Sequence, residues 1–191
     1  MAQDRMPNEL KPADIFLTRG DSWISAGIRF FSRGIGEART RVNHAGLIVE
    51  GGPLTVAVAV EARSRVLRHR LWDAYGPPCR DAVAIYRARN LTDDDVKRIV
   101  ARAEDYVGRK YGVLKIAAHL ADWALLGAYA FRRLAAMDKY PICSWVVAHA
   151  YAKAGKNFGV APGAAQPDDI WDFIKSPPDI YEEVWPLQRL E

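Results

Sequence analysis

The chain has very little cysteine. Its 191 residues contain two cysteines, Cys79 and Cys143, and neither stands in a Cys-x-x-Cys pair or in the His/Cys spacing of a zinc site. Two cysteines cannot supply the several bridges that hold a small disulfide-rich domain together. These absences exclude a disulfide framework and argue against a metal site.

Long hydrophobic runs are also missing. Lys115, His119 and Asp122 interrupt the most apolar stretch, residues 113–134, whereas a membrane-spanning helix needs about 20 predominantly apolar residues. Residues 1–13 are polar and have no secretory signal pattern. We expect residues 1–13 to be flexible and the protein to be cytoplasmic, with export by another route or association with a virion left open. Residues 113–134 predict a core helix or helical hairpin; the alternative is an apolar wall for an acyl or lipid substrate, or a membrane-facing patch.

The charged residues are not concentrated in one part of the sequence. The net charge is +4 and the sequence pI is about 9.1, but the arginines are scattered and no aromatic residues interleave with them. This pattern does not indicate a nucleic-acid groove, so no nucleic-acid partner is expected, and it leaves open a weak peripheral contact with anionic lipid or cell-wall polymer. Half of the residues are hydrophobic, and the length suffices for one domain spanning residues 1–191.

Cys143 is the first candidate for chemistry. It lies in the first turn of a helix that we expect to begin at Pro141 and to end before Gly155. A thiol at a helix N-terminus faces the positive end of the backbone dipoles, which favours the nucleophilic thiolate. The alternative is a buried thiol that packs as a small apolar side chain. Cys79, in the basic and turn-rich segment 63–80, is expected to be incidental.

A β-hairpin is expected upstream, with strands at residues 42–49 and 55–62. If its turn centres near Gly52 and Pro53, residues whose numbers sum to about 105 face one another, and Glu61 lies opposite or diagonal to His44. A carboxylate there would orient the imidazole, as the third member of a nucleophilic triad does. A buried pair without chemistry and an exposed cross-strand charge pair are the alternatives.

Further strands and helices complete the expected pattern. Thr92 and Asp95 resemble a capping box at the start of a helix, and Pro167 begins another helix with acidic residues at its positive end. The remaining expected elements are strands at 14–18, 82–86 and 180–185, the last at a sheet edge, and a helix at 22–31.

Six short motifs occur in an order that is typical of one known superfamily. They are Asp14-Ile-Phe-Leu, Asn43-His-Ala-Gly-Leu, Val60-Glu-Ala, Gly108-Arg-Lys-Tyr-Gly, Ile142-Cys-Ser-Trp-Val and Pro167-Asp-Asp-Ile-Trp. With them the chain resembles the circularly permuted branch of the NlpC/P60 superfamily, in particular the YiiX/YebB-like proteins, with the lecithin retinol acyltransferase-like enzymes as more distant relatives. The resemblance spans nearly the whole chain. It implies an α+β, circularly permuted papain-like fold in which an antiparallel sheet packs against helices, including the nucleophile helix.

The resemblance also implies a role for each site residue. Cys143 corresponds to the nucleophile, His44 to the general base and Glu61 to the polar residue that orients the base. Tyr111 matches the tyrosine of a Gly-x-x-Tyr motif that lies near the oxyanion in related hydrolases, and Ser144 joins it in the expected substrate and oxyanion region. Departures from the family pattern at residues 43, 45, 112 and 144–145 bear on the substrate class more than on the triad.

The expected activity is that of a cysteine amidase or peptidase. The thiolate would attack an amide, either a peptidoglycan-type peptide or an N-acyl or lipid amide, and form a thioester acyl-enzyme without any cofactor. A thiol acyltransferase is left open, because it differs only in the acceptor. A non-catalytic binding or virion-associated module that retains the fold is the other alternative. The sequence predicts no oligomeric state.

Overall fold

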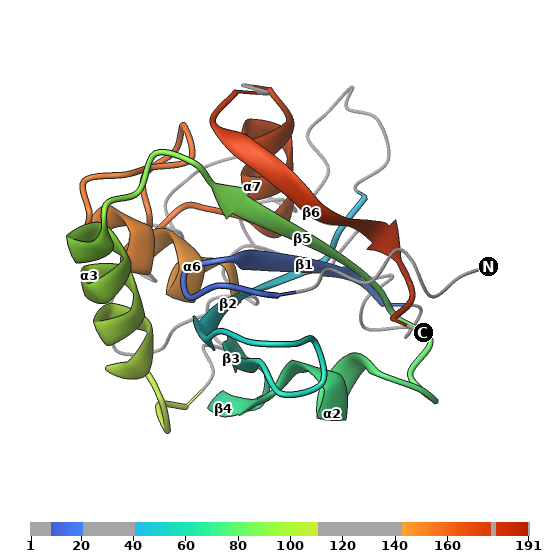
Figure 1. The fold of residues 1–191 in the computed structure, drawn as a ribbon. Helices are drawn as coiled ribbons and strands as arrows, with labels where there is room; N and C mark the ends of the chain where they lie inside the picture. Colours follow the sequence, from blue (N-terminus) through green and yellow to red (C-terminus); the bar gives the residue numbers. More distant parts are fainter. Residues whose placement is uncertain (1–8, 21–40, 111–142, 177–178, 191) are drawn as a thin grey trace, which may run out of the picture.

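A six-stranded antiparallel sheet is the centre of the computed structural model, which describes residues 9–20, 41–110, 143–176 and 179–190. The strands lie in the order β4-β3-β2-β1-β5-β6, so β4 and β6 form the two edges (Figure 1). Their bounds are β1 (Ile15–Arg19), β2 (His44–Glu50), β3 (Val58–Ala62), β4 (Val66–Arg70), β5 (Ala82–Ala88) and β6 (Tyr181–Gln188).

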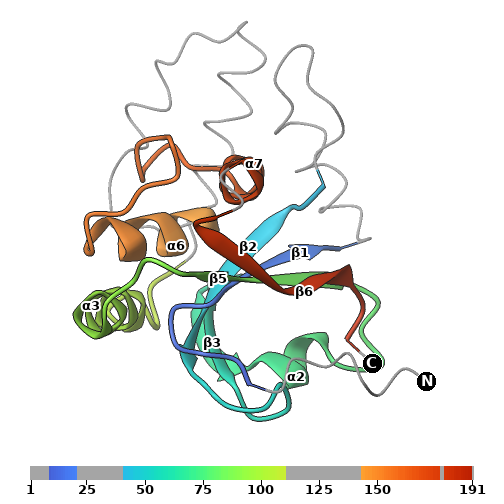
Figure 2. The same cartoon turned by 45° about the horizontal axis from the view of Figure 1, so that its top comes forward.

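Four helices accompany the sheet in the described ranges: α2 (Leu71–Tyr75), α3 (Asp93–Glu104), α6 (Cys143–Ala152) and α7 (Pro167–Lys175). Helices α3 and α6 pack against each other and against β2. Figure 2 shows α2 on the opposite side of the sheet, next to the curl of β3 and β4. The chain is therefore a mixed α+β fold with helices on both faces of the sheet.

Alternating side chains of the strands divide the core into two clusters. Ile15, Leu17 and Leu47 point toward α3, α6 and α7, where they join Ile99, Val146 and other buried residues of these helices. The residues between them in the strands point the other way, toward α2, in a second cluster that includes Phe16, Ile48, Ala59, Leu71, Tyr75, Val83 and Ile85. His44 lies on the same sheet face as Ile48, four positions along β2, and Glu61 lies on the same face as Ala59, two positions along β3. Both side chains are therefore on the face of the second cluster.

The observed hairpin differs from the predicted one at its turn. The turn is longer, since the backbone N–H groups of Val56 and Ala57 both donate to the Pro53 carbonyl, and β3 begins only at Val58. Gly46 is the residue that faces Glu61. The register thus differs by two residues from direct pairing of Glu61 with His44, which keeps both side chains on one face and makes them diagonal neighbours.

Segment 63–80 was predicted as a turn-rich loop, and this prediction is wrong. It contains β4 and α2, which continue the hairpin into a third strand and a short helix. Strand β4 was missed because three of its five residues, Arg68, His69 and Arg70, are polar. Among the described strands β4 lies at the sheet edge next to β3, and an edge strand tolerates such residues.

The other predicted elements in the described ranges are confirmed. Thr92 caps α3, with its Oγ1 accepting from the Asp95 N–H at 3.2 Å and the Asp95 carboxylate accepting from the Thr92 N–H at 3.0 Å. Proline begins α7. The strand near 180–185 is present as β6, at a sheet edge as predicted. The predicted helices at 22–31 and 113–134 lie outside the described residues, and within those residues no helix is long and apolar enough to span a membrane.

Packing extends further toward the N-terminus than the expected flexible segment 1–13 would allow. Leu10 is fully buried and exchanges backbone hydrogen bonds of 2.8 and 2.9 Å with Gly52. The next turn is fixed by Asp14, whose two carboxylate oxygens accept from the Arg87 guanidinium at 2.8 and 2.7 Å. Residues 1–8 lie outside the described residues.

Gly46 gives the first testable prediction. A Cβ at this position would lie far inside the van der Waals distance of the Phe16 ring and 3.0 Å from Cβ of Glu61. Gly46→Ala should therefore lower the free energy of unfolding by about 1–3 kcal/mol, measured by urea denaturation. Gly163→Ala is the control, because its new Cβ would meet only the Trp145 ring, at 3.7 Å. Equal stability of the two variants would contradict the close packing at Gly46.

Candidate active site

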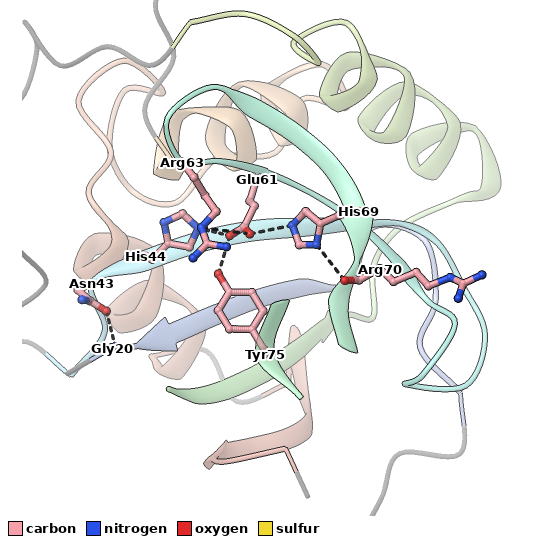
Figure 3. Close-up of polar contacts among 8 residues, drawn as sticks. All are labelled: Gly20, Asn43, His44, Glu61, Arg63, His69, Arg70 and Tyr75. Carbon is pink, nitrogen blue, oxygen red and sulfur yellow. Dashed lines mark hydrogen bonds and ion pairs between the residues drawn. The ribbon is translucent and has the colours of Figure 1, made fainter. Parts of the chain in front are cut away.

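A buried carboxylate, Glu61, lies at the centre of the site. Its side chain is completely inaccessible to solvent and accepts hydrogen bonds from three side chains (Figure 3). His44 Nε2 and the Tyr75 hydroxyl approach Oε2, the latter at 2.6 Å. His69 Nε2 approaches Oε1 at 2.8 Å. The Arg63 guanidinium lies near the same oxygen, with its Nε at 3.9 Å.

The strand order explains how these side chains come together. Strand β3 lies between β2 and β4, and Glu61 pairs with Gly46 on one side and Leu67 on the other. His44 precedes Gly46 by two residues and His69 follows Leu67 by two, so both imidazoles reach Glu61 diagonally on the same face. Two histidines on neighbouring strands therefore flank one carboxylate.

The hydrogen bonds keep Glu61 ionised. Burial alone would raise the pKa of its carboxyl group, because a charge loses its hydration in the interior. The positive charge and hydrogen bond of His44, together with the hydrogen bonds from His69 and Tyr75, instead hold the pKa of Glu61 well below its usual range. Three donors thus replace the water that a buried carboxylate needs.

His44 is the member of the pair that carries the proton. Burial would lower the pKa of the imidazole, but the charges of Glu61 and Cys143 and the hydrogen bonds to both raise the pKa of His44 to about 10. Because Nε2 faces Glu61, Nδ1 is the nitrogen left to face the thiol. At neutral pH this geometry favours an imidazolium between two anions.

Cys143 is the first residue of α6 and is buried. Burial would raise the pKa of the thiol, but the charge of His44, a hydrogen bond with His44 and the backbone N–H groups of Ala45 and Ser144 together hold the pKa of Cys143 below its usual value. The arrangement favours a thiolate–imidazolium pair, which is the reactive form of a nucleophilic cysteine. Cys143, His44 and Glu61, predicted from the sequence as one site, come together in the structure.

Of the two residues predicted for the substrate and oxyanion region, the structure describes only Ser144. Tyr111 lies outside the described residues. Ser144 is fully buried, and its hydroxyl donates to the Ala165 carbonyl at 2.7 Å. A serine hydroxyl has one hydrogen to donate, so this side chain holds the 165 loop against α6 instead of facing a substrate. The part of Ser144 that touches the site is its backbone N–H, beside the Cys143 sulfur.

Sequence reasoning missed three residues around Glu61: Arg63, His69 and Tyr75. All three lie in the segment that was read as a loop, so no face could be assigned to them. The available signal was weak: Leu67 and His69 alternate with arginines, which is compatible with an edge strand.

The described polar side chains around Glu61 form hydrogen bonds with one another. Within the described part of the chain, no group of three or more His, Cys, Asp or Glu side chains is placed to hold a metal ion. The oxygens of Glu61 already accept from three donors, and the second nitrogen of His69 bonds a backbone carbonyl. The donor set is that of a hydrogen-bonded network.

The imidazole of His44 provides the second prediction. In Glu61→Gln the anion is lost while the cost of burying an imidazolium remains, so the pKa of His44 should fall from about 10 by more than about one unit. The ring ¹⁵N chemical shifts followed against pH measure this change. Glu50→Gln is the matched control, since Glu50 lies at the other end of β2 and pairs with Arg68. A pKa of His44 that is the same in all three proteins would contradict the role assigned to Glu61.

Of the comparisons with known proteins, only the one with solved structures finds a match, and it bears on the fold alone. No family model and no curated protein sequence matches the chain. Among solved structures, the crystal structure of the metalloprotein yiiX from Escherichia coli O157:H7, described as DUF1105, is similar with a TM-score of 0.54. The sequences are 19% identical, and the match covers 78% of this chain and 69% of that one. The chain therefore has a yiiX-like mixed α+β fold.

Proposed function

We propose that this protein is a cysteine hydrolase of the NlpC/P60 type that cleaves an amide through Cys143, His44 and Glu61. The observation that carries the proposal is the contact of a helix-start thiol with an imidazole that a buried, fully hydrogen-bonded carboxylate holds on its other side. The order of the sequence motifs and the yiiX-like fold support a circularly permuted papain-like architecture, in which the histidine strand precedes the cysteine helix.

The first half of the reaction forms an acyl-enzyme. The Cys143 thiolate attacks the amide carbonyl carbon, and the electron pair of the C=O bond moves to oxygen. Backbone N–H groups in the first turn of α6, at the positive end of the helix dipole, stabilise this oxyanion. His44 then gives its proton to the amide nitrogen, the C–N bond breaks, and the amine leaves behind a thioester on Cys143.

The second half regenerates the enzyme. Neutral His44 accepts a proton from a water molecule as its oxygen attacks the thioester carbon. The C–S bond then breaks, and the products are a carboxylic acid and the Cys143 thiolate next to protonated His44. Glu61 remains ionised throughout, because its part is to stabilise the imidazolium and fix its orientation, so its loss should reduce the rate less than loss of Cys143 or His44.

The proposed substrate is an amide, and two classes fit the proposal. One is a peptidoglycan-type peptide, and the other is an N-acyl or lipid amide. Contact with a cell wall or a membrane surface would accompany these substrates and belongs to the same proposal. A thiol acyltransferase would share every step up to the thioester and differ in the nucleophile that releases it.

Thiol reactivity tests the proposal before a substrate is known. Iodoacetamide should alkylate Cys143 at least about 10-fold faster than Cys79 at pH 7, because the charge of His44 and two backbone N–H groups favour the Cys143 thiolate. His44→Ala should remove this difference, and mass spectrometry of the tryptic peptides measures both rates. Equal, slow labelling of both cysteines in the unchanged protein would support a non-catalytic module instead.

Hydrolysis is the decisive measurement. The protein is incubated with cell-wall stem peptides and with N-acyl amides, and the released amine is quantified. Cys143→Ala should lower the rate by at least about 1,000-fold on any amide that the unchanged protein cleaves, while Cys79→Ala should keep the rate. Full activity of Cys143→Ala would disprove the mechanism.

A further inference from the structure

His69 makes two hydrogen bonds that determine where its protons lie. Its Nδ1 is 2.9 Å from the carbonyl oxygen of Arg70, which can only accept, so Nδ1 carries a hydrogen. Its Nε2 is 2.8 Å from Oε1 of Glu61, and one proton must lie between these two atoms. The question is therefore which of the two groups, imidazole or carboxyl, holds this second proton.

The surroundings place that proton on nitrogen. Oε2 of Glu61 already accepts from His44 and Tyr75, and two donors stabilise the ionised carboxylate. Burial would lower the pKa of His69, but the hydrogen bonds to Glu61 and to the Arg70 carbonyl, followed by the charge of Glu61, raise it. The Arg63 guanidinium is the opposing group, since its positive charge lowers the pKa of His69.

We infer that His69 is held as an imidazolium and acts as a positioning residue, which fixes the Glu61 carboxylate and shares its negative charge with His44. This role rests on the proposed function only in its consequence for catalysis. The protonation state itself depends on the three-strand arrangement alone.

The geometry shows why Glu61 needs this contact. Without His69, Oε1 would be buried with Arg63 Nε at 3.9 Å, which is beyond hydrogen-bonding distance. The carboxylate would then be anchored through Oε2 alone and could rotate away from His44. With His69 present, both oxygens are held, and the plane of the carboxylate is fixed between two rings on β2 and β4.

The shared charge also bears on the acidity of His44. Two cations compete for one anion, so His69 keeps the pKa of His44 lower than Glu61 alone would set it. The charged groups that face this network are Arg63 on the His69 side, Cys143 on the His44 side, and Asp81, whose charge acts on Tyr75. The residue of β3 that pairs with His69 is Ala59, which carries no charge.

The first test reads the protons directly and needs no activity. In ¹⁵N-histidine-labelled protein at pH 7.5, well above the ordinary histidine pKa of about 6.5, both ring nitrogens of His69 should have imidazolium shifts. The signal is assigned by its loss in His69→Gln. A neutral tautomer at this pH, with one unprotonated ring nitrogen, would overturn the inference.

The second test separates charge from packing. His69→Gln keeps an N–H donor for Glu61 but removes the positive charge, so the ring ¹⁵N titration of His44 should move upward by about half a pH unit or more. The alkaline limb of the Cys143 alkylation rate should move with it. Arg70→Gln is the matched control: it removes a positive charge from the next residue of β4, whose exposed side chain has no contact with Glu61, and it should leave both values unchanged.

Each outcome has one meaning. An upward shift in His69→Gln alone supports the inference. No shift, a downward shift, or an equal shift in Arg70→Gln would overturn it, because His69 would then only fill space or act as a distant surface charge. An imidazolium signal from His69 in a protein that hydrolyses no amide would sustain this inference and count against the proposed function.

Discussion

The arrangement of β2, β3, β4 and α2 around the site depends on the free-energy cost of burying one negative charge, that of Glu61. Glu61 is completely removed from solvent in the middle of a three-strand segment, and a carboxylate there is stable only when donors replace its water. The fold supplies one donor from each neighbouring strand and one from the helix that follows β4. The same requirement fixes the orientation of His44, because the imidazole is one of the donors that the charge demands. Structure and chemistry at this site are therefore two results of one electrostatic constraint.

The constraint extends to the thiol through the imidazole. A buried cysteine is ordinarily a small apolar side chain, and burial of Cys143 alone would suppress its ionisation. His44 reverses this preference because Glu61 keeps it charged. Backbone N–H groups from β2 and from α6 add to the effect, so the thiolate is stabilised where a strand and a helix begin side by side. The fold thus prepares an ion pair before any substrate arrives, which is the property that the proposed hydrolysis uses.

The sequence predicted the three residues of this core but not its outer part. Alternation along β2 and β3 was enough to put His44 and Glu61 on one face, and the observed diagonal arrangement is one of the two that the sequence predicted. The helix at Cys143 was visible from Pro141 and from the apolar residues that follow. Strand β4 was not visible, since its arginines and histidine lack the apolar alternation that marks a half-buried strand. His69 reaches Glu61 because β4 pairs with β3, and Tyr75 reaches it from α2, and both placements depend on tertiary structure.

Chain order has a consequence for the newly made protein. The strands that carry His44 and Glu61 leave the ribosome well before Cys143, and the cysteine gains its low pKa only when α6 packs against β2. During synthesis the nascent polypeptide therefore holds an ordinary, weakly nucleophilic sulfur. Its reactivity is gained when α6 docks against β2, so a copy in which this contact has not formed would react more slowly with electrophiles around it.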